Sequence, residues 1–90
     1  MSGEAFLGMD VGTARTMADE MLTDATQLDS LIREVDAALG DLPWSGADAD
    51  TFREQWKGTF RAELRRAAEH LHRQGSDLRV RVGRQTKASA

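Results

Sequence analysis

The 90-residue sequence contains no cysteine, no tyrosine and a single proline, and aromatic residues make up only 6% of it. Without cysteine, neither a disulfide nor a thiolate metal site can stabilise the fold. No apolar run approaches the about 18 residues that a membrane-spanning helix needs. The first residues carry no Lys or Arg and no long apolar segment, so a conventional cleaved signal peptide is not expected. A chain of this length predicts one small domain, which buries a thin core and often needs a partner.

Charges of opposite sign are divided between the two halves of the chain. Residues 1–50 carry eleven Asp or Glu and two Arg, hence a net charge of −9. Residues 51–90 carry ten Lys or Arg and four acids, hence +6. This division favours two elements that lie side by side with complementary fields. A basic tail that binds nucleic acid or a membrane surface is less consistent with the acidic half, which would repel both.

Apolar residues of the first half recur at alternating steps of three and four. They are Ala14, Ala18, Met21, Ala25, Leu28, Ile32, Val35, Leu39 and Leu42. This heptad pattern predicts a helix over about 10–39, with Asp10 or Thr13 as its N-cap. Gly40 is expected to end the helix in the left-handed C-cap conformation, and the turn then covers 40–46.

A second periodic segment follows the turn closely. Its apolar positions are Ala49, Phe52, Trp56, Phe60, Leu64, Ala67, Leu71 and Leu78. They predict a helix over about 47–82, and Ser45 with Asp48 resembles a capping box at its start. Gln-Gly-Ser at 74–76 offers one place for the helix to fray or end, but a helical continuation that pairs Leu78 with Val82 is favoured over a short extended piece. Residues 84–90 are expected to form a loose tail.

Two long helices joined by a short turn predict a single all-α domain, an antiparallel helix-turn-helix hairpin. A lone hairpin cannot enclose all of these apolar side chains, so we expect two hairpins to dimerise into a four-helix bundle. The residues assigned to the core or the dimer interface are Met21, Ala25, Leu28, Ile32, Val35, Leu39, Phe52, Trp56, Phe60, Leu64 and Leu71.

The sequence offers little support for catalysis or for a bound metal. His70 and His72 are two residues apart and therefore point to different sides of a helix. Asp48 and Asp50 lack the further ligands and the glycine of a calcium loop, and are better explained as acids in a first helical turn. We expect no enzyme activity, no cofactor and no metal.

The turn holds the most distinctive residues, Trp44 and Gly46. A tryptophan and a glycine at this point either only shape the hairpin or add a recognition surface. Trp44-Ser45-Gly46 between two long helices, followed by Asp48-Ala-Asp50-Thr-Phe52 and Trp56, resembles the WXG family, the early-secreted-antigen-like proteins of about a hundred residues. The stretch "FLGMDVGTAR" is also similar to segments that precede the first helix in actinobacterial members. The resemblance covers roughly residues 6–80.

This resemblance implies a small non-enzymatic substrate or secretion partner of a type VII (ESX-like) system. Such a protein is cytoplasmic before export and then secreted or held at the cell surface, without a cleaved signal peptide. The implied partners are another WXG-type chain and the secretion ATPase, with no nucleic acid and no membrane insertion. Trp44 and Gly46 are the implied recognition residues.

One feature of the family's export signal is missing from this chain. The family's Tyr-xxx-Asp/Glu tail signal cannot be present without tyrosine. We therefore favour a heterodimer in which the partner carries that signal, and a homodimer is the alternative. The competing function is a cytoplasmic adaptor that binds nucleic acid or anionic surfaces through residues 73–87, and a steep salt dependence of DNA binding would distinguish it.

Overall fold

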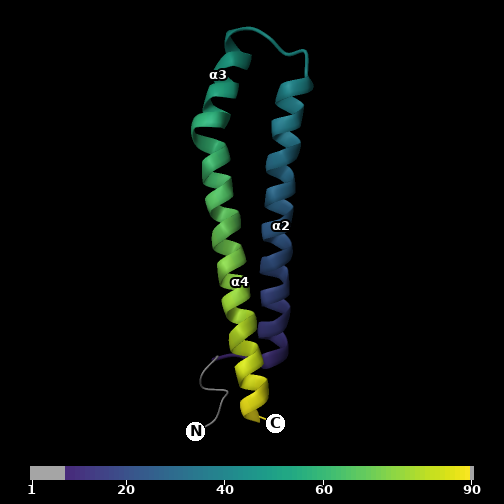
Figure 1. Cartoon of the computed structure of the whole chain (residues 1–90), viewed down its shortest axis with the longest axis vertical. Coiled ribbons are helices and arrows are strands. Elements are labelled where there is room, and N and C mark those ends of the chain that lie inside the picture. Colours follow the sequence, from purple (N-terminus) through teal and green to yellow (C-terminus); the bar gives the residue numbers. More distant parts are fainter. Residues whose placement is uncertain (1–7, 90) are drawn as a thin grey trace.

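A computed structural model describes residues 8–89, and two long helical arms pack antiparallel in it (Figure 1). The first arm is α2, Val11–Asp41. The second arm consists of α3, Ala47–Gln55, the π-helical turn η1, Trp56–Phe60, and α4, Arg61–Ser89. The molecule measures 64 × 18 × 14 Å, the shape of one extended hairpin. The predicted all-α antiparallel hairpin is confirmed, whereas its pairing into a four-helix bundle stays a prediction.

Different local interactions set the two ends of α2. Asp10 is the N-cap, and its side chain accepts a hydrogen bond from the Thr13 N–H at 3.0 Å. At the other end, the predicted left-handed cap at Gly40 is wrong, because the helix continues through Asp41. Leu42 then becomes extended, with φ −71° and ψ 134°. Pro43 explains this stop, since a residue that precedes proline is driven out of the helical region.

The second arm begins at Gly46 and not at the predicted capping box of Ser45 and Asp48. Gly46 is the N-cap with φ 113°, and no side chain caps the helix there. Nothing lies within 4 Å of a Cβ added at Gly46, so the glycine is required by the backbone conformation and not by crowding. Asp48 and Asp50 lie in the first turn of α3, where acids stabilise the helix dipole.

The second arm is longer than the sequence predicts. α4 runs without a break through residues 74–76, which confirms the favoured helical continuation to Val82. It goes on to Ser89, so the loose tail expected over 84–90 is wrong as far as Ser89. Residues 1–7 and Ala90 lie outside the described part of the chain. Residues 1–7 include the start of the stretch that resembles the WXG family. They also include most of the N-terminal residues on which the expected lack of a signal peptide is based. Of the helices among residues 8–89, none is both long and apolar enough to cross a membrane.

The core between the arms is built mainly from small side chains. The buried hydrophobic residues are Ala14, Ala18, Ala25, Ile32, Ala49, Trp56, Ala68 and Val82. Because alanine adds little bulk, the two backbones approach closely, and the larger side chains lie at the edges of the contact. Met21, Leu28 and Val35 are half-buried there, and the predicted seam position Leu42 is exposed.

The arms come especially close at Gly75. A Cβ added there would lie 3.0 Å from Leu22 Cγ, 3.1 Å from the Ala18 carbonyl oxygen and 3.1 Å from Met21 Cβ. Contacts of this length are shorter than ordinary van der Waals separation, and one of them is to backbone. Gly75 is therefore a packing position, and tertiary contact explains why it does not end the helix.

The π-turn shifts the buried stripe of the second arm by one residue. Arg61 N–H donates to the Trp56 carbonyl five residues earlier, which inserts one extra residue into the helix. Beyond the turn, the side that faces α2 is spaced from Arg61 in steps of seven, at Ala68 and Gly75. Ala68 and not Ala67 therefore enters the core, and Phe60 is exposed. Phe60 and Ala67 thus lie outside the core of the single hairpin, because regular periodicity carries no signal for a π-turn. The assignment of Phe60 to a dimer interface stays a prediction.

We expect Gly75→Ala and Gly83→Ala to change the free energy of unfolding in opposite directions. No atom lies within 4 Å of a Cβ at Gly83, so alanine there should stabilise α4 by about 0.5–1 kcal/mol through its helix propensity. At Gly75 overpacking should outweigh that gain, for a net loss of about 1–3 kcal/mol. Urea unfolding followed by circular dichroism measures both, and equal stabilisation by the two substitutions would contradict the close approach.

Candidate functional site at the hairpin tip and edges

The tip of the hairpin exposes a small aromatic cluster. The Trp44 side chain is 43% exposed, and its ring lies 5.8 Å from the Phe52 ring at a tilt of 48°. The Arg53 guanidinium lies 5.9 Å from the Trp44 ring centroid, within the range of a cation–π contact. Arg53 Nε also donates to the Leu39 carbonyl at 3.2 Å, so this side chain ties the tip to α2. The cluster therefore holds Trp44 in place and leaves much of its ring accessible.

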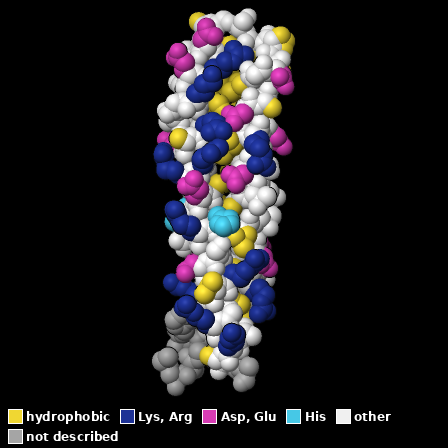
Figure 2. Space-filling view, in the orientation of Figure 1, with side chains coloured by type: hydrophobic (Ala, Val, Ile, Leu, Met, Phe, Trp, Pro, Cys, Tyr) yellow, Lys and Arg dark blue, Asp and Glu magenta, His cyan; other side chains and the backbone are white. Residues whose placement is uncertain are grey.

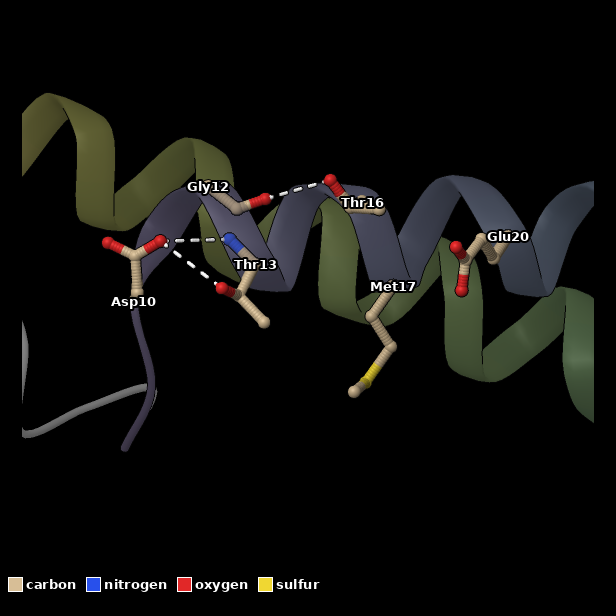
Figure 3. A pocket seen from close by; sticks show the side chains of 6 residues that line it. All are labelled: Asp10, Gly12, Thr13, Thr16, Met17 and Glu20. Atoms are coloured by element: carbon tan, nitrogen blue, oxygen red, sulfur yellow. Dashed lines mark hydrogen bonds between the residues drawn. The ribbon is translucent and has the colours of Figure 1, made fainter.

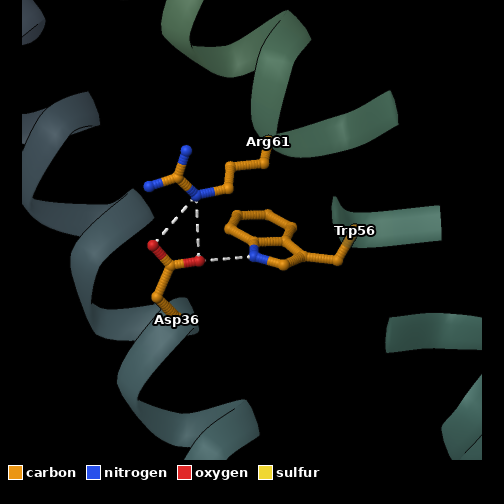
Figure 4. A network of polar contacts seen from close by, with 3 residues as sticks. All are labelled: Asp36, Trp56 and Arg61. Carbon is orange, nitrogen blue, oxygen red and sulfur yellow. Dashed lines mark hydrogen bonds and ion pairs between the residues drawn. The ribbon is translucent and has the colours of Figure 1, made fainter. Parts of the chain in front are cut away.

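The other tryptophan has the opposite environment. Trp56 is 5% exposed, and its indole N–H donates to Asp36 Oδ1 at 2.8 Å (Figure 4). Arg61 Nε donates to both carboxylate oxygens of Asp36, at 3.1 and 3.0 Å. The π-turn places Trp56 and Arg61, at its two ends, on the same carboxylate. Asp36 and Arg61 were not predicted as partners, and only the opposite charges of the two halves indicated such a contact.

The environment of Asp36 stabilises its charged form. The hydrogen bond from Trp56 lowers the pKa of the Asp36 carboxyl below its ordinary value, and the hydrogen bond and positive charge of Arg61 lower it further. Partial desolvation opposes the shift without reversing it. Asp36 is therefore a charged anchor between the arms, and its side chain remains about one-third exposed at 36%.

Polar contacts between the arms lie along one edge of the hairpin. Arg79 pairs with Asp19 at 2.6 Å, and the Arg15 guanidinium donates to the Thr86 hydroxyl at 3.4 Å. With the Asp36 contacts they define a polar edge, made of Arg15, Asp19, Asp36, Arg61, Arg79 and Thr86. The face drawn in Figure 2 shows Lys, Arg, Asp and Glu on both sides of a narrow strip of hydrophobic atoms. Oppositely charged halves thus meet as predicted, although exposed pairs stabilise by only about 0–1 kcal/mol each.

The edge on the other side of the hairpin is apolar. Met17, Asp24 and Leu31, spaced by seven residues, lie on the far side of the buried alanines from Arg15 and Asp36. We call the large apolar side chains on this side of the hairpin the apolar face. They are Met17, Met21, Leu28, Leu31, Val35, Phe60, Leu64, Leu71 and Leu78. Exposed fractions of 37%, 44% and 40% for Met17, Leu31 and Phe60 show that the hairpin alone does not cover it.

The predicted interface residues fall into three groups. Ala25, Ile32 and Trp56 are buried between the arms, and Met21, Leu28, Val35, Leu39, Leu64 and Leu71 are half-buried at the edges. Phe52 and Phe60 are exposed, so neither belongs to the core of a single hairpin. A role of these residues between two hairpins stays a prediction.

Several other polar groups either form hydrogen bonds within their own helix or are exposed on its surface. In a shallow hollow at the start of α2, Asp10 accepts from Thr13, and the Thr16 hydroxyl donates to the Gly12 carbonyl (Figure 3). His70 and His72 are exposed. Among the described residues, no group of three or more His, Asp or Glu is placed to hold a metal ion.

Gln85 is an unexpected polar residue in the core near the open end of the hairpin. Its side chain is 2% exposed, and within the described part of the chain neither Nε2 nor Oε1 has a hydrogen-bond partner. A buried amide without partners lowers the free energy of unfolding. The position is buried because it follows Leu78 and Val82 on the side of α4 that faces α2. Gln85 was not predicted in the core, because its segment was expected to form a loose tail.

Comparisons with protein-family models, with curated proteins and with solved structures found no match. The accessible tip, the polar edge and the apolar face are the features of the hairpin that bear on its function.

We expect acid to weaken the hairpin partly through Asp36. Because its pKa is lower in the folded state, its stabilising contribution is complete above the ordinary value of 3.8 and is lost as the pH falls through the lower folded-state value. In Asp36→Asn this contribution is absent at every pH. The free energy of unfolding in urea, measured from neutral pH to about pH 2, should fall less steeply for the variant. Asp24→Asn is the control for loss of a carboxylate, and parallel profiles for Asp36→Asn and the wild type would contradict the expectation.

We expect Gln85→Met to raise the free energy of unfolding by about 1–2 kcal/mol, since it removes two unpaired buried polar atoms and keeps the side-chain length. Gln27→Met, at an exposed position of α2, is the matched control and should change stability by less than about 0.5 kcal/mol. Urea unfolding of both variants provides the measurement. A loss of stability in Gln85→Met would mean that the amide is hydrogen-bonded in solution.

Proposed function

We propose that this chain is a small non-enzymatic hairpin of WXG type that serves as a substrate or secretion partner of a type VII secretion system. It acts as one half of a dimer with another WXG-type chain. The secretion ATPase is the second partner in this proposal, and the protein is exported folded without a cleaved signal peptide.

The position of Trp44-Ser45-Gly46 carries the proposal. The three residues lie in the short connection between two long antiparallel helices, outside the buried contact of the arms. Gly46 adopts a conformation that favours glycine, and Trp44 presents an accessible ring. Buried Trp56 contributes to packing, so the exposed tryptophan is the one available for recognition.

The apolar face supports the proposed pairing of two hairpins. Its large side chains run from Met17 to Val35 on α2 and from Phe60 to Leu78 on the second arm, and they are left half-buried or exposed. Such a surface on a small chain is typical of a protein–protein interface. A second hairpin laid against it gives each large side chain an apolar neighbour, as in a four-helix bundle.

The alternative of nucleic-acid binding through residues 73–87 is supported less well. Arg79 is paired with Asp19 on the other arm, and Arg81 is paired with Asp77 one turn earlier. Both arginines thus have neighbouring carboxylates that compete with phosphate.

Export of a Trp44→Ala variant tests the proposal. We expect the wild-type chain in the culture medium of its source organism, and in the cells alone when the type VII ATPase is deleted. Trp44→Ala should retain its helical circular dichroism and reduce the exported fraction at least about tenfold, because the accessible ring is a recognition contact whose loss costs affinity. Val80→Ala, which shortens another exposed apolar side chain, is the control and should be exported like the wild type.

Two results would overturn the proposal. One is ATPase-independent appearance of the wild-type chain in the medium, or its complete retention in cells. The other is normal export of Trp44→Ala. Unfolding of Trp44→Ala would assign the ring a mainly structural role, which its exposure argues against.

A further inference from the structure

The charges around the apolar face distinguish between possible partners. We infer that the face takes a different helical hairpin, one whose docking surface is edged by Lys and Arg, and not a second copy of this chain. The inference rests on the proposed pairing of two hairpins and adds the chemistry of the partner.

Acidic side chains outnumber basic ones on the outer margin of the apolar face, the side away from the polar edge. The exposed acids there, which we call the acidic margin, are Glu20, Asp24, Glu34, Asp41, Glu63 and Asp77. Arg81 and Arg84 are the basic residues of the same margin, and Arg81 is already paired with Asp77 at 3.1 Å. The margin is thus strongly negative although the second arm as a whole is basic.

Acids of the two edges differ in how they are compensated. On the polar edge, Asp19 and Asp36 are paired with arginines of the other arm. In the described part of the chain, Glu20, Asp24 and Glu34 take part in no ion pair. Among the described residues, arginines of the other arm thus compensate Asp19 and Asp36, whereas no ion pair compensates these three acids of the margin on α2.

Asp24 is the acid that bears most directly on docking. It lies seven residues after Met17 and seven before Leu31, so it occupies the same row of α2 as these exposed apolar side chains. Any chain that covers Met17 and Leu31 also covers or borders Asp24. A Lys or Arg at the facing position would compensate its charge, whereas another carboxylate would repel it.

The charge around the apolar face disfavours a symmetric pair. A symmetric dimer presents the same patch twice, so two acidic margins would meet around one apolar contact. A partner with a basic margin replaces this repulsion by attraction and also speeds association.

A charge-reversed form of the chain itself provides the probe. The variant Glu20→Lys/Asp24→Lys/Glu34→Lys turns the α2 part of the margin basic and leaves the apolar side chains in place. Asp29→Lys/Glu54→Lys/Glu69→Lys makes the same change in net charge at exposed acids away from the face, and is the matched control. Circular dichroism checks that each variant is folded, and the single Asp24→Lys variant repeats the test with a smaller change.

Association of the full-length chains is then measured by analytical ultracentrifugation at low and high salt. Wild type mixed with the margin variant should form a one-to-one pair at least about tenfold tighter than the wild-type homodimer, with an advantage that shrinks as salt is added. Wild type mixed with the control variant should show no such advantage.

Two outcomes would overturn the inference. A wild-type homodimer as tight as the mixed pair would mean that a second copy covers the face, and absence of any pairing would mean that the face does not dock a hairpin. Export is measured separately, so Trp44-dependent export of a homodimer would refute only the basic partner. Loss of Trp44 dependence in a chain that pairs as expected would refute only the proposed function.

Discussion

The close approach of the two arms is the constraint on which the rest of the hairpin depends. Alanines along α2 and Gly75 on α4 leave no room for larger groups between the backbones. Large apolar side chains such as Leu28 and Leu71 are consequently displaced to the edge of the contact, where one hairpin covers them only in part. A small-residue core thus produces both a thin pair of helices and an apolar surface that one hairpin leaves partly uncovered.

The polar edge fixes how the arms are aligned. Asp36 receives hydrogen bonds from Trp56 and Arg61, which are brought to one carboxylate by the extra residue of the π-turn. Sliding or rotating one arm would break this anchor and the pair between Asp19 and Arg79 together. Directional contacts of this kind specify one alignment, while the apolar contacts supply most of the stability.

The two tryptophans lie in opposite environments. Trp56 is buried and bonded to Asp36, whereas Trp44 lies at the tip beside Phe52 and Arg53 with an accessible ring. The proposed secretion role uses the tip, and the proposed heteromeric pairing uses the apolar face with its acidic margin. These surfaces are separate, so loss of recognition and loss of pairing can be told apart by mutation.

The sequence by itself determined the hairpin, a start of α2 near Asp10 or Thr13 and the buried positions of Ala14, Ala18 and Ala25, because heptad spacing and capping chemistry act locally. Only the tertiary structure decided the π-turn, and with it the choice of Ala68 over Ala67 and the exposure of Phe60. It also decided that α4 continues through Gly75 to Ser89 and buries Gln85. Packing against α2 outweighs the low helix propensity of glycine and the tendency of chain ends to fray. At such positions the sequence alone shows only these local tendencies.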